Sequence, residues 1–227
     1  MRKIINSIPN TITSLNLFCG CLAIVYALNN DLIMAFYLML GSAILDFFDG
    51  FAARMLNAYS PIGKELDSLA DVVSFGVVPA MIMYMSGMGA FAFVIAIFSA
   101  LRLAKFNIDT RQQTTFIGLP TPANALFFCS IGFLVQSYPD SSVVDIIFTN
   151  EYFQYITAVI FSLLLVSEIP MFSLKFKSYS FAKNAKVYIF LLLSICGLIA
   201  FKFFAVPFII VTYVLFSVIE YIINKQK

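Results

Sequence analysis

The sequence has no histidine and no tryptophan, and only 11% of its 227 residues are charged. Soluble domains carry about 25% charged residues, so this chain cannot cover a water-facing surface, which excludes a cytosolic enzyme. The net charge of +2 is too small to indicate nucleic acid as a partner. Without histidine, any general base or metal ligand must be another side chain.

Cysteine is also sparse, with four residues that all lie in apolar stretches. Cys19 and Cys21 are two positions apart, so on a helix they point to different faces. This spacing does not favour a metal site or a disulfide framework. We interpret all four as small apolar side chains.

Apolar residues make up 61% of the chain, and the mean hydropathy is +0.94. A membrane span needs about 20 apolar residues, so the length allows about eight. The sequence therefore predicts an all-α fold: a polytopic membrane helical bundle in a single domain, residues 1–227. The predicted spans are Thr11–Leu28, Leu32–Met55, Ile62–Met85, Ala90–Ala104, Pro122–Tyr138, Tyr152–Met171, Lys186–Phe203 and Val206–Ile223.

The basic residues predict the orientation of this bundle. If the N-terminus is cytoplasmic, that side receives every lysine and arginine except Lys202, whereas the loop 139–151 is acidic and has no basic residue. The positive-inside rule then predicts that the protein lies in the cell membrane with both termini and the basic face on the cytoplasmic side. A cleaved signal peptide in residues 1–28 is the alternative, but it would remove one span and this charge balance.

Four aspartates interrupt two otherwise apolar spans. Asp46 and Asp49 share one helix face, as do Asp67 and Asp71, and the turn before Pro61 makes a helical hairpin in which the two faces can meet. A charge at the bilayer centre costs at least about 2.5–3.5 kcal/mol, so the cluster requires a positive ligand. Carboxylates favour Mg²⁺, Mn²⁺ or Ca²⁺ over zinc.

Small residues continue both acidic faces. Gly50 and Ala53 follow Asp49, and Gly63 precedes Asp67. They either leave space for a ligand between the helices or allow close helix packing.

The pattern Asp46-x2-Asp49-Gly50-x2-Ala53-Arg54-x8-Gly63-x3-Asp67-x3-Asp71, residues 46–71, resembles the signature of the CDP-alcohol phosphatidyltransferase family at every position. The resemblance implies an enzyme that moves a phosphatidyl group from a CDP-linked lipid to an alcohol and releases CMP. It also implies a homodimer.

The same resemblance implies a role for each signature residue. Two divalent ions, Mg²⁺ or Mn²⁺, would be held by Asp46, Asp49, Asp67 and Asp71. Asp71 would also be the catalytic general base, and CDP would be bound by Asp49, Gly50, Ala53, Arg54 and Gly63. Two metal ions can neutralise a diphosphate, and an aspartate can accept the proton of a hydroxyl.

The acceptor is suggested by residues 8–27 and 102–123, which resemble the family members that use L-serine with CDP-diacylglycerol. A serine needs a cation for its carboxylate and an anion or carbonyl for its ammonium. The predicted cytoplasmic segment offers Asn107, Asp109 and Arg111, near Arg102 and Lys105. These can also form an ordinary positive-inside loop. Glycerol phosphate or inositol phosphate as acceptor, and a cation transporter, stay open as alternatives.

Overall fold

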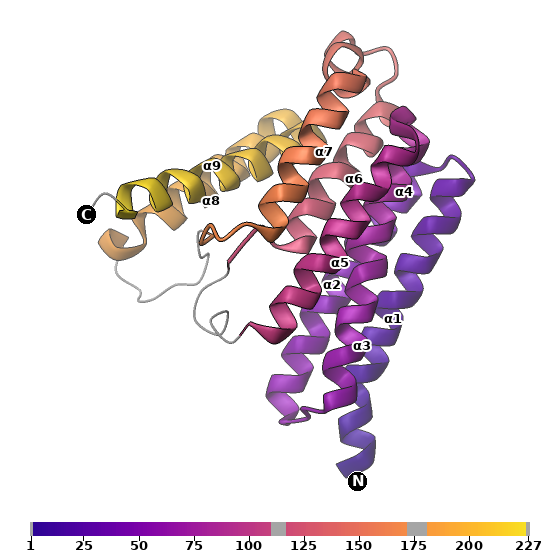
Figure 1. Cartoon of the computed structure of the whole chain (residues 1–227), viewed down its shortest axis with the longest axis vertical. Helices are drawn as coiled ribbons and strands as arrows, with labels where there is room; N and C mark the ends of the chain where they lie inside the picture. Colours follow the sequence, from indigo (N-terminus) through magenta and orange to yellow (C-terminus); the bar gives the residue numbers. More distant parts are fainter. Residues whose placement is uncertain (1, 110–116, 172–180, 226–227) are drawn as a thin grey trace.

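A computed structural model describes residues 2–109, 117–171 and 181–225 of the chain. These residues form helices almost throughout, and no β-strand occurs among them (Figure 1). Along the chain the helices are α1 (Arg2–Leu28), α2 (Leu32–Leu56), α3 (Pro61–Val72), η1 (Val73–Val77), α4 (Val78–Met83), η2 (Tyr84–Met88), η3 (Gly89–Ala92), α5 (Phe93–Ile108), α6 (Thr121–Ser137), η5 (Val144–Phe148), α7 (Glu151–Val166), α8 (Phe181–Phe201), η6 (Lys202–Phe204) and α9 (Ala205–Lys225).

Four helical runs within the described residues are long and apolar enough to cross a membrane: Ser7–Leu28, Leu32–Leu56, Pro61–Ile108 and Val187–Ile223. The last two runs each join more than one helix. The predicted fold class, a polytopic helical membrane protein, is therefore confirmed. The number of spans and the cytoplasmic position of the termini stay predictions.

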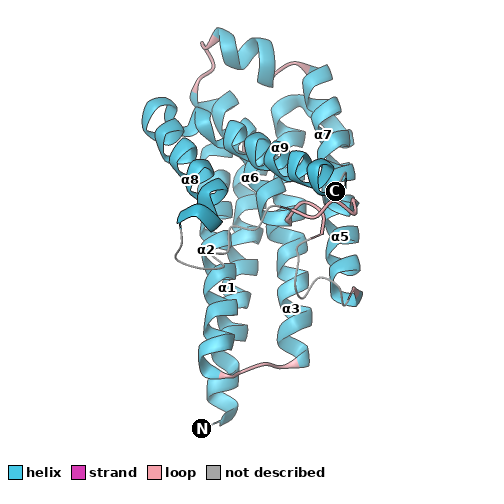
Figure 2. Cartoon of the chain, turned by 90° about the vertical axis from the view of Figure 1, so that its left-hand side faces the viewer, coloured by secondary structure: helices cyan, strands magenta, loops and turns pink. Residues whose placement is uncertain are grey.

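The helices α1 to α7 run roughly along the long axis of the molecule, whereas α8 and α9 form a pair that is inclined to this axis (Figures 1 and 2). The first helix packs against both α2 and α3, while α2 and α3 are scarcely in contact with each other. The hairpin is thus open between its two arms, with α1 alongside. This opening lies between the two acidic faces.

Local sequence accounts for the turn between α2 and α3. Asn57 adopts a left-handed conformation (φ 49°) that ends α2, and asparagine tolerates this conformation better than most residues. Ser60 caps α3 by accepting a hydrogen bond from Gly63 N at 2.9 Å, and Pro61 occupies the first helical turn, where no N–H is needed. The predicted hairpin is therefore present.

The predicted span Ile62–Met85 is not one regular α-helix. After α3 the chain makes a turn of π-helix, in which Val78 N–H bonds to Val73 O. Pro79 follows directly and has no N–H to donate four residues back. A π-helical turn contains one residue more than an α-helical turn, which rotates the following side chains about the helix axis. The helix faces before and after Val73 are therefore not continuous.

The predicted span Tyr152–Met171 also differs, because α7 ends at Val166. The following residues run beside the segment before α6: Gly118 N–H bonds to Ile169 O and Leu119 N–H to Leu164 O, both at 2.9 Å. Gly118 has φ +75°, and a Cβ there would lie 2.5 Å from Leu165 O. Only glycine fits this approach.

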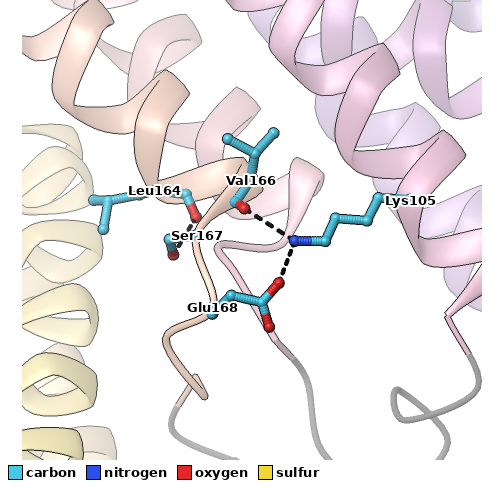
Figure 3. Close-up of polar contacts among 5 residues, drawn as sticks. All are labelled: Lys105, Leu164, Val166, Ser167 and Glu168. Carbon is cyan, nitrogen blue, oxygen red and sulfur yellow. Dashed lines mark hydrogen bonds and ion pairs between the residues drawn. The ribbon is translucent and has the colours of Figure 1, made fainter.

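The C-terminal end of α5 also contacts the residues that follow α7. Lys105 Nζ bonds to Glu168 Oε1 at 2.5 Å and to Val166 O at 3.3 Å, and Ser167 Oγ donates to Leu164 O at 2.9 Å (Figure 3). This ion pair links the end of α5 to the residues that follow α7.

Candidate active site

The four aspartates of the signature meet between α2 and α3. One carboxylate oxygen from each of Asp46, Asp49 and Asp67 lies within 4.8 Å of the others. The carboxyl of Asp46 is also within hydrogen-bonding reach of Asp71. Two pairs of aspartates, at least 18 positions apart in the sequence, are thereby assembled into one acidic cluster.

The donor set of this cluster fits a hard divalent cation. Carboxylate oxygens are the ligands that Mg²⁺ and Mn²⁺ prefer. In addition, Asp71 Oδ1 is buried and has no hydrogen-bond partner among the described residues. Buried carboxylates without partners are costly, so the cluster is suited to a positively charged ligand.

Helix α1 supplies a side chain that the sequence reasoning did not single out. Thr13, buried at 2% exposure, donates a hydrogen bond from Oγ1 to Asp49 Oδ2 at 2.7 Å. Asp49 is itself only 6% exposed. The available signal was a polar residue inside an apolar span, but its partner could not be read from spacing because the two are on different helices.

A cavity of about 170 Å³ opens beside the cluster, between α1, α2 and α3. Four of the five residues predicted to bind CDP line it, and so does the metal-ligand candidate Asp67. The lining residues are Pro9, Asn10, Thr13, Asp49, Gly50, Ala53, Ala58, Tyr59, Ser60, Gly63, Lys64 and Asp67. The fifth predicted CDP residue, Arg54, is exposed at the end of α2.

Two glycines of the signature have different surroundings. A Cβ at Gly50 would make only an ordinary contact, at 3.4 Å from Arg54 Nη1, so the arginine side chain lies beside this glycine without requiring it. A Cβ at Gly63 would lie 2.7 Å from Asn10 Oδ1 and 2.9 Å from Ser60 Oγ. Gly63 therefore serves the close packing of α1 on α3 as well as lining the cavity.

Arg102 lies elsewhere than expected. The charge pattern placed it among the cytoplasmic basic residues, at the end of the predicted span Ala90–Ala104, but α5 continues to Ile108. Arg102 is 7% exposed, its guanidinium lies 5.1 Å from the centre of the Phe106 ring, and it interacts electrostatically with Asp71. The residue thus belongs to the interior of the acidic site.

Two of the three predicted serine contacts, Asn107 and Asp109, lie in the described part of the chain. Asn107 Nδ2 donates to Ser68 Oγ at 2.8 Å, and Asn107 O accepts from Lys64 Nζ at 3.2 Å, so Asn107 is held against α3 near the cluster. Asp109 follows α5, with its N–H bonded to Lys105 O at 3.0 Å. Arg111 lies outside the described residues.

Most of these helices match a known protein family. The model of the family described as CDP-alcohol phosphatidyltransferase matches residues 6–166. A Bacillus subtilis (strain 168) protein named CDP-diacylglycerol–serine O-phosphatidyltransferase is 44% identical over 124 residues, 52% of this chain and 70% of that protein. A Methanocaldococcus jannaschii protein of the same name is 39% identical over 191 residues, 77% of this chain and 90% of the relative.

A third relative with that name, from Helicobacter pylori (strain J99), is 44% identical over 128 residues. This chain spans about half of its length, 54%. The family model covers well over half of the chain and includes all four aspartates of the cluster. The chain therefore belongs to the CDP-alcohol phosphatidyltransferase family and is an enzyme of this family of phosphotransferases.

Proposed function

We propose that the protein transfers the phosphatidyl group of CDP-diacylglycerol to the hydroxyl of L-serine, which yields phosphatidylserine and CMP. The observation that carries the proposal is the convergence of Asp46, Asp49 and Asp67 beside a cavity at the signature residues. The choice of serine is supported by the names of the relatives from Bacillus subtilis and Methanocaldococcus jannaschii.

In this proposal the aspartates hold two divalent ions, Mg²⁺ or Mn²⁺. Bound there, such ions would neutralise the diphosphate of the donor and the charge that develops on it. Asp49, Gly50, Ala53, Arg54 and Gly63 would bind the CDP group. The cavity between α1, α2 and α3, which four of these residues line, supports that assignment.

Asp71 is the general base of the proposed reaction. It accepts the proton of the serine hydroxyl, the serine oxygen forms a bond to the lipid phosphorus, and the bond from that phosphorus to CMP breaks. Support comes from the buried, unpartnered Oδ1 of Asp71, because a base must have a free oxygen to receive a proton. Asn107, Asp109 and Arg111 are the proposed serine contacts.

The proposal also includes the setting of the enzyme. We place it as one domain, residues 1–227, in the cytoplasmic membrane, in contact with membrane lipids, with its site open to the cytoplasm and as a homodimer. The distribution of lysine and arginine along the sequence supports this orientation.

Lipid analysis tests the function directly. Purified protein in CDP-diacylglycerol-containing micelles is supplied in turn with L-serine, glycerol phosphate and inositol phosphate, and the lipid products are separated by thin-layer chromatography. We expect phosphatidylserine and CMP from serine alone. A product from either phosphate and none from serine would refute the choice of acceptor.

The same assay tests the acidic cluster with a matched pair of variants. Asp67→Asn should remove most of the activity, because it deletes a charge from the carboxylate cluster. Glu65→Gln removes a charge from the same helix at an exposed position and should leave the activity unchanged. Equal activity of the two variants would contradict the assignment of the cluster.

A further inference from the structure

One buried cation has no role in the reaction as described so far. Arg102 projects from the middle of α5 and is 7% exposed, although arginine is rarely buried unless it is paired. Its Nε is among the buried polar atoms without a hydrogen-bond partner in the described part of the chain. A buried guanidinium with an unpaired N–H requires a hydrogen-bond partner, and the described side chains do not supply one to this Nε.

The packing of α5 on α3 and η1 sets the position of this cation. The two runs are antiparallel: a Cβ at Gly76 would lie 3.2 Å from Ser99 Cβ, and Asn107 Nδ2 bonds to Ser68 Oγ. Asp71 and Arg102 both lie between these two points of contact, and the two groups interact electrostatically. The proposed base and the buried arginine are therefore close to each other in the interior.

Asp71 and Arg102 interact electrostatically, yet they do not form an ion pair. The described residues contain one ion pair, between Lys105 and Glu168, so the separation of Asp71 and Arg102 exceeds the limit of about 4 Å for such a contact. Asp71 Oδ1 and Arg102 Nε are both buried without partners. A small polar molecule between them would satisfy both groups.

Two aromatic residues complete the surroundings of the guanidinium. The Phe106 ring lies beneath it, at 5.1 Å from its centre. Tyr213 of α9 is 9% exposed and interacts electrostatically with Arg102. The last helix, for which the sequence indicated no role, thus places a buried tyrosine near the arginine.

We propose that Arg102 binds the carboxylate of the amino-acid acceptor, with the acceptor's hydroxyl directed at Asp71. This inference rests on the proposed function. A planar guanidinium matches a carboxylate in a two-point contact. In serine the carboxylate and the hydroxyl are on adjacent carbon atoms, so one molecule can reach both partners.

The donor is not the natural partner of Arg102. The cavity lined by the CDP-binding candidates lies between α1, α2 and α3, and no residue of α5 lines it. Asp71 interacts with both Asp46 and Arg102, and neither Asp71 nor Arg102 is among the residues that line that cavity. Donor and acceptor would thus approach the cluster from different directions.

This arrangement makes Arg102 a determinant of acceptor choice. An acceptor without a carboxylate, such as ethanolamine, would leave the buried guanidinium unpaired, and a site discriminates strongly against a ligand that leaves its polar groups unpaired. We therefore expect the wild-type enzyme to prefer serine to ethanolamine and the preference to depend on Arg102.

Steady-state kinetics of Arg102→Gln and Arg102→Lys test the inference. Arg102→Gln should raise the KM for serine about tenfold to a thousandfold without changing the KM for CDP-diacylglycerol, and the preference for serine over ethanolamine should fall. Arg102→Lys keeps the charge but not the two-point geometry, so an intermediate serine KM is expected. Lys202→Gln, at an exposed basic position, is the control and should match wild type.

The outcomes separate this inference from the proposed function. Wild-type enzyme that makes no lipid from serine refutes the function itself. Wild-type enzyme active with serine, together with an unchanged serine KM in both arginine variants, overturns the inference alone. A parallel rise of both KM values also overturns it, because a purely structural arginine would affect both substrates. Should Arg102→Gln fail to fold in detergent, Arg102→Lys decides by the same criteria.

Discussion

Replacing Thr13 by valine tests whether a hydrogen bond from α1 positions one of the metal-ligand candidates. The substitution keeps the shape of the side chain and removes the hydroxyl that donates to Asp49 Oδ2 at 2.7 Å. A hydrogen bond to a charged group contributes about 1.5–3 kcal/mol, and about 1.4 kcal/mol corresponds to a tenfold change in affinity. We therefore expect Thr13→Val to weaken divalent-metal binding about 10- to 100-fold, in the range found for residues that orient metal ligands.

The assay is a titration with Mn²⁺ or Mg²⁺ after complete chelation, followed both by activity and by the metal-dependent rise in melting temperature. Thr13→Ser keeps the hydroxyl and should restore most of the affinity. Thr11→Val is the matched control, because Thr11 is exposed on the same helix and its hydroxyl donates to a backbone oxygen four residues back, Ser7 O, at 2.9 Å, just as Thr13 has Pro9 O at 3.0 Å. A metal affinity in Thr13→Val equal to that of the control would refute the reasoning.

Three further predictions follow from the site and the fold. EDTA should abolish turnover and Mg²⁺ or Mn²⁺ should restore it, and full activity in a chelated sample would contradict a metal-dependent cluster. Asp71→Asn should lower kcat by about 10²–10⁴ with less effect on the KM for CDP-diacylglycerol than Asp67→Asn, whereas equal effects on both constants would show that Asp71 is not the base. Gly118→Ala should lower the melting temperature because its backbone has φ +75° and its Cβ would meet Leu165 O, whereas Gly41→Ala, with no atom within 4 Å of the added Cβ, should not.

The acidic site illustrates what spacing within a helix can predict. Asp46 and Asp49 are one turn apart, and Asp67 and Asp71 are one turn apart, so each pair shares a face by helix geometry alone. Pro61 and Ser60 are standard helix-start residues, and they indicate the turn that folds one pair toward the other. The cluster could therefore be expected before any tertiary contact was known, and the structure brings the carboxylates together.

Contacts between helices distant in the chain were not predictable in this way. Thr13 reaches Asp49 across 36 positions, and Tyr213 of α9 approaches Arg102 of α5. No periodicity within either helix specifies such a partner, because periodicity gives the face of a helix but not the neighbour that covers it. Arg102 was assigned to the cytoplasmic side by the distribution of basic residues, and only the packing of α5 on α3 places it in the interior.

Composition and spacing within a few helical turns were enough to predict the helical membrane fold, the family and the acidic cluster. Three features became visible only in the folded protein: α1 covers the open hairpin, a π-helical turn follows Asp71, and a buried arginine lies near the proposed base. These features depend on how helices pack, and packing is decided by the fit of many side chains at once.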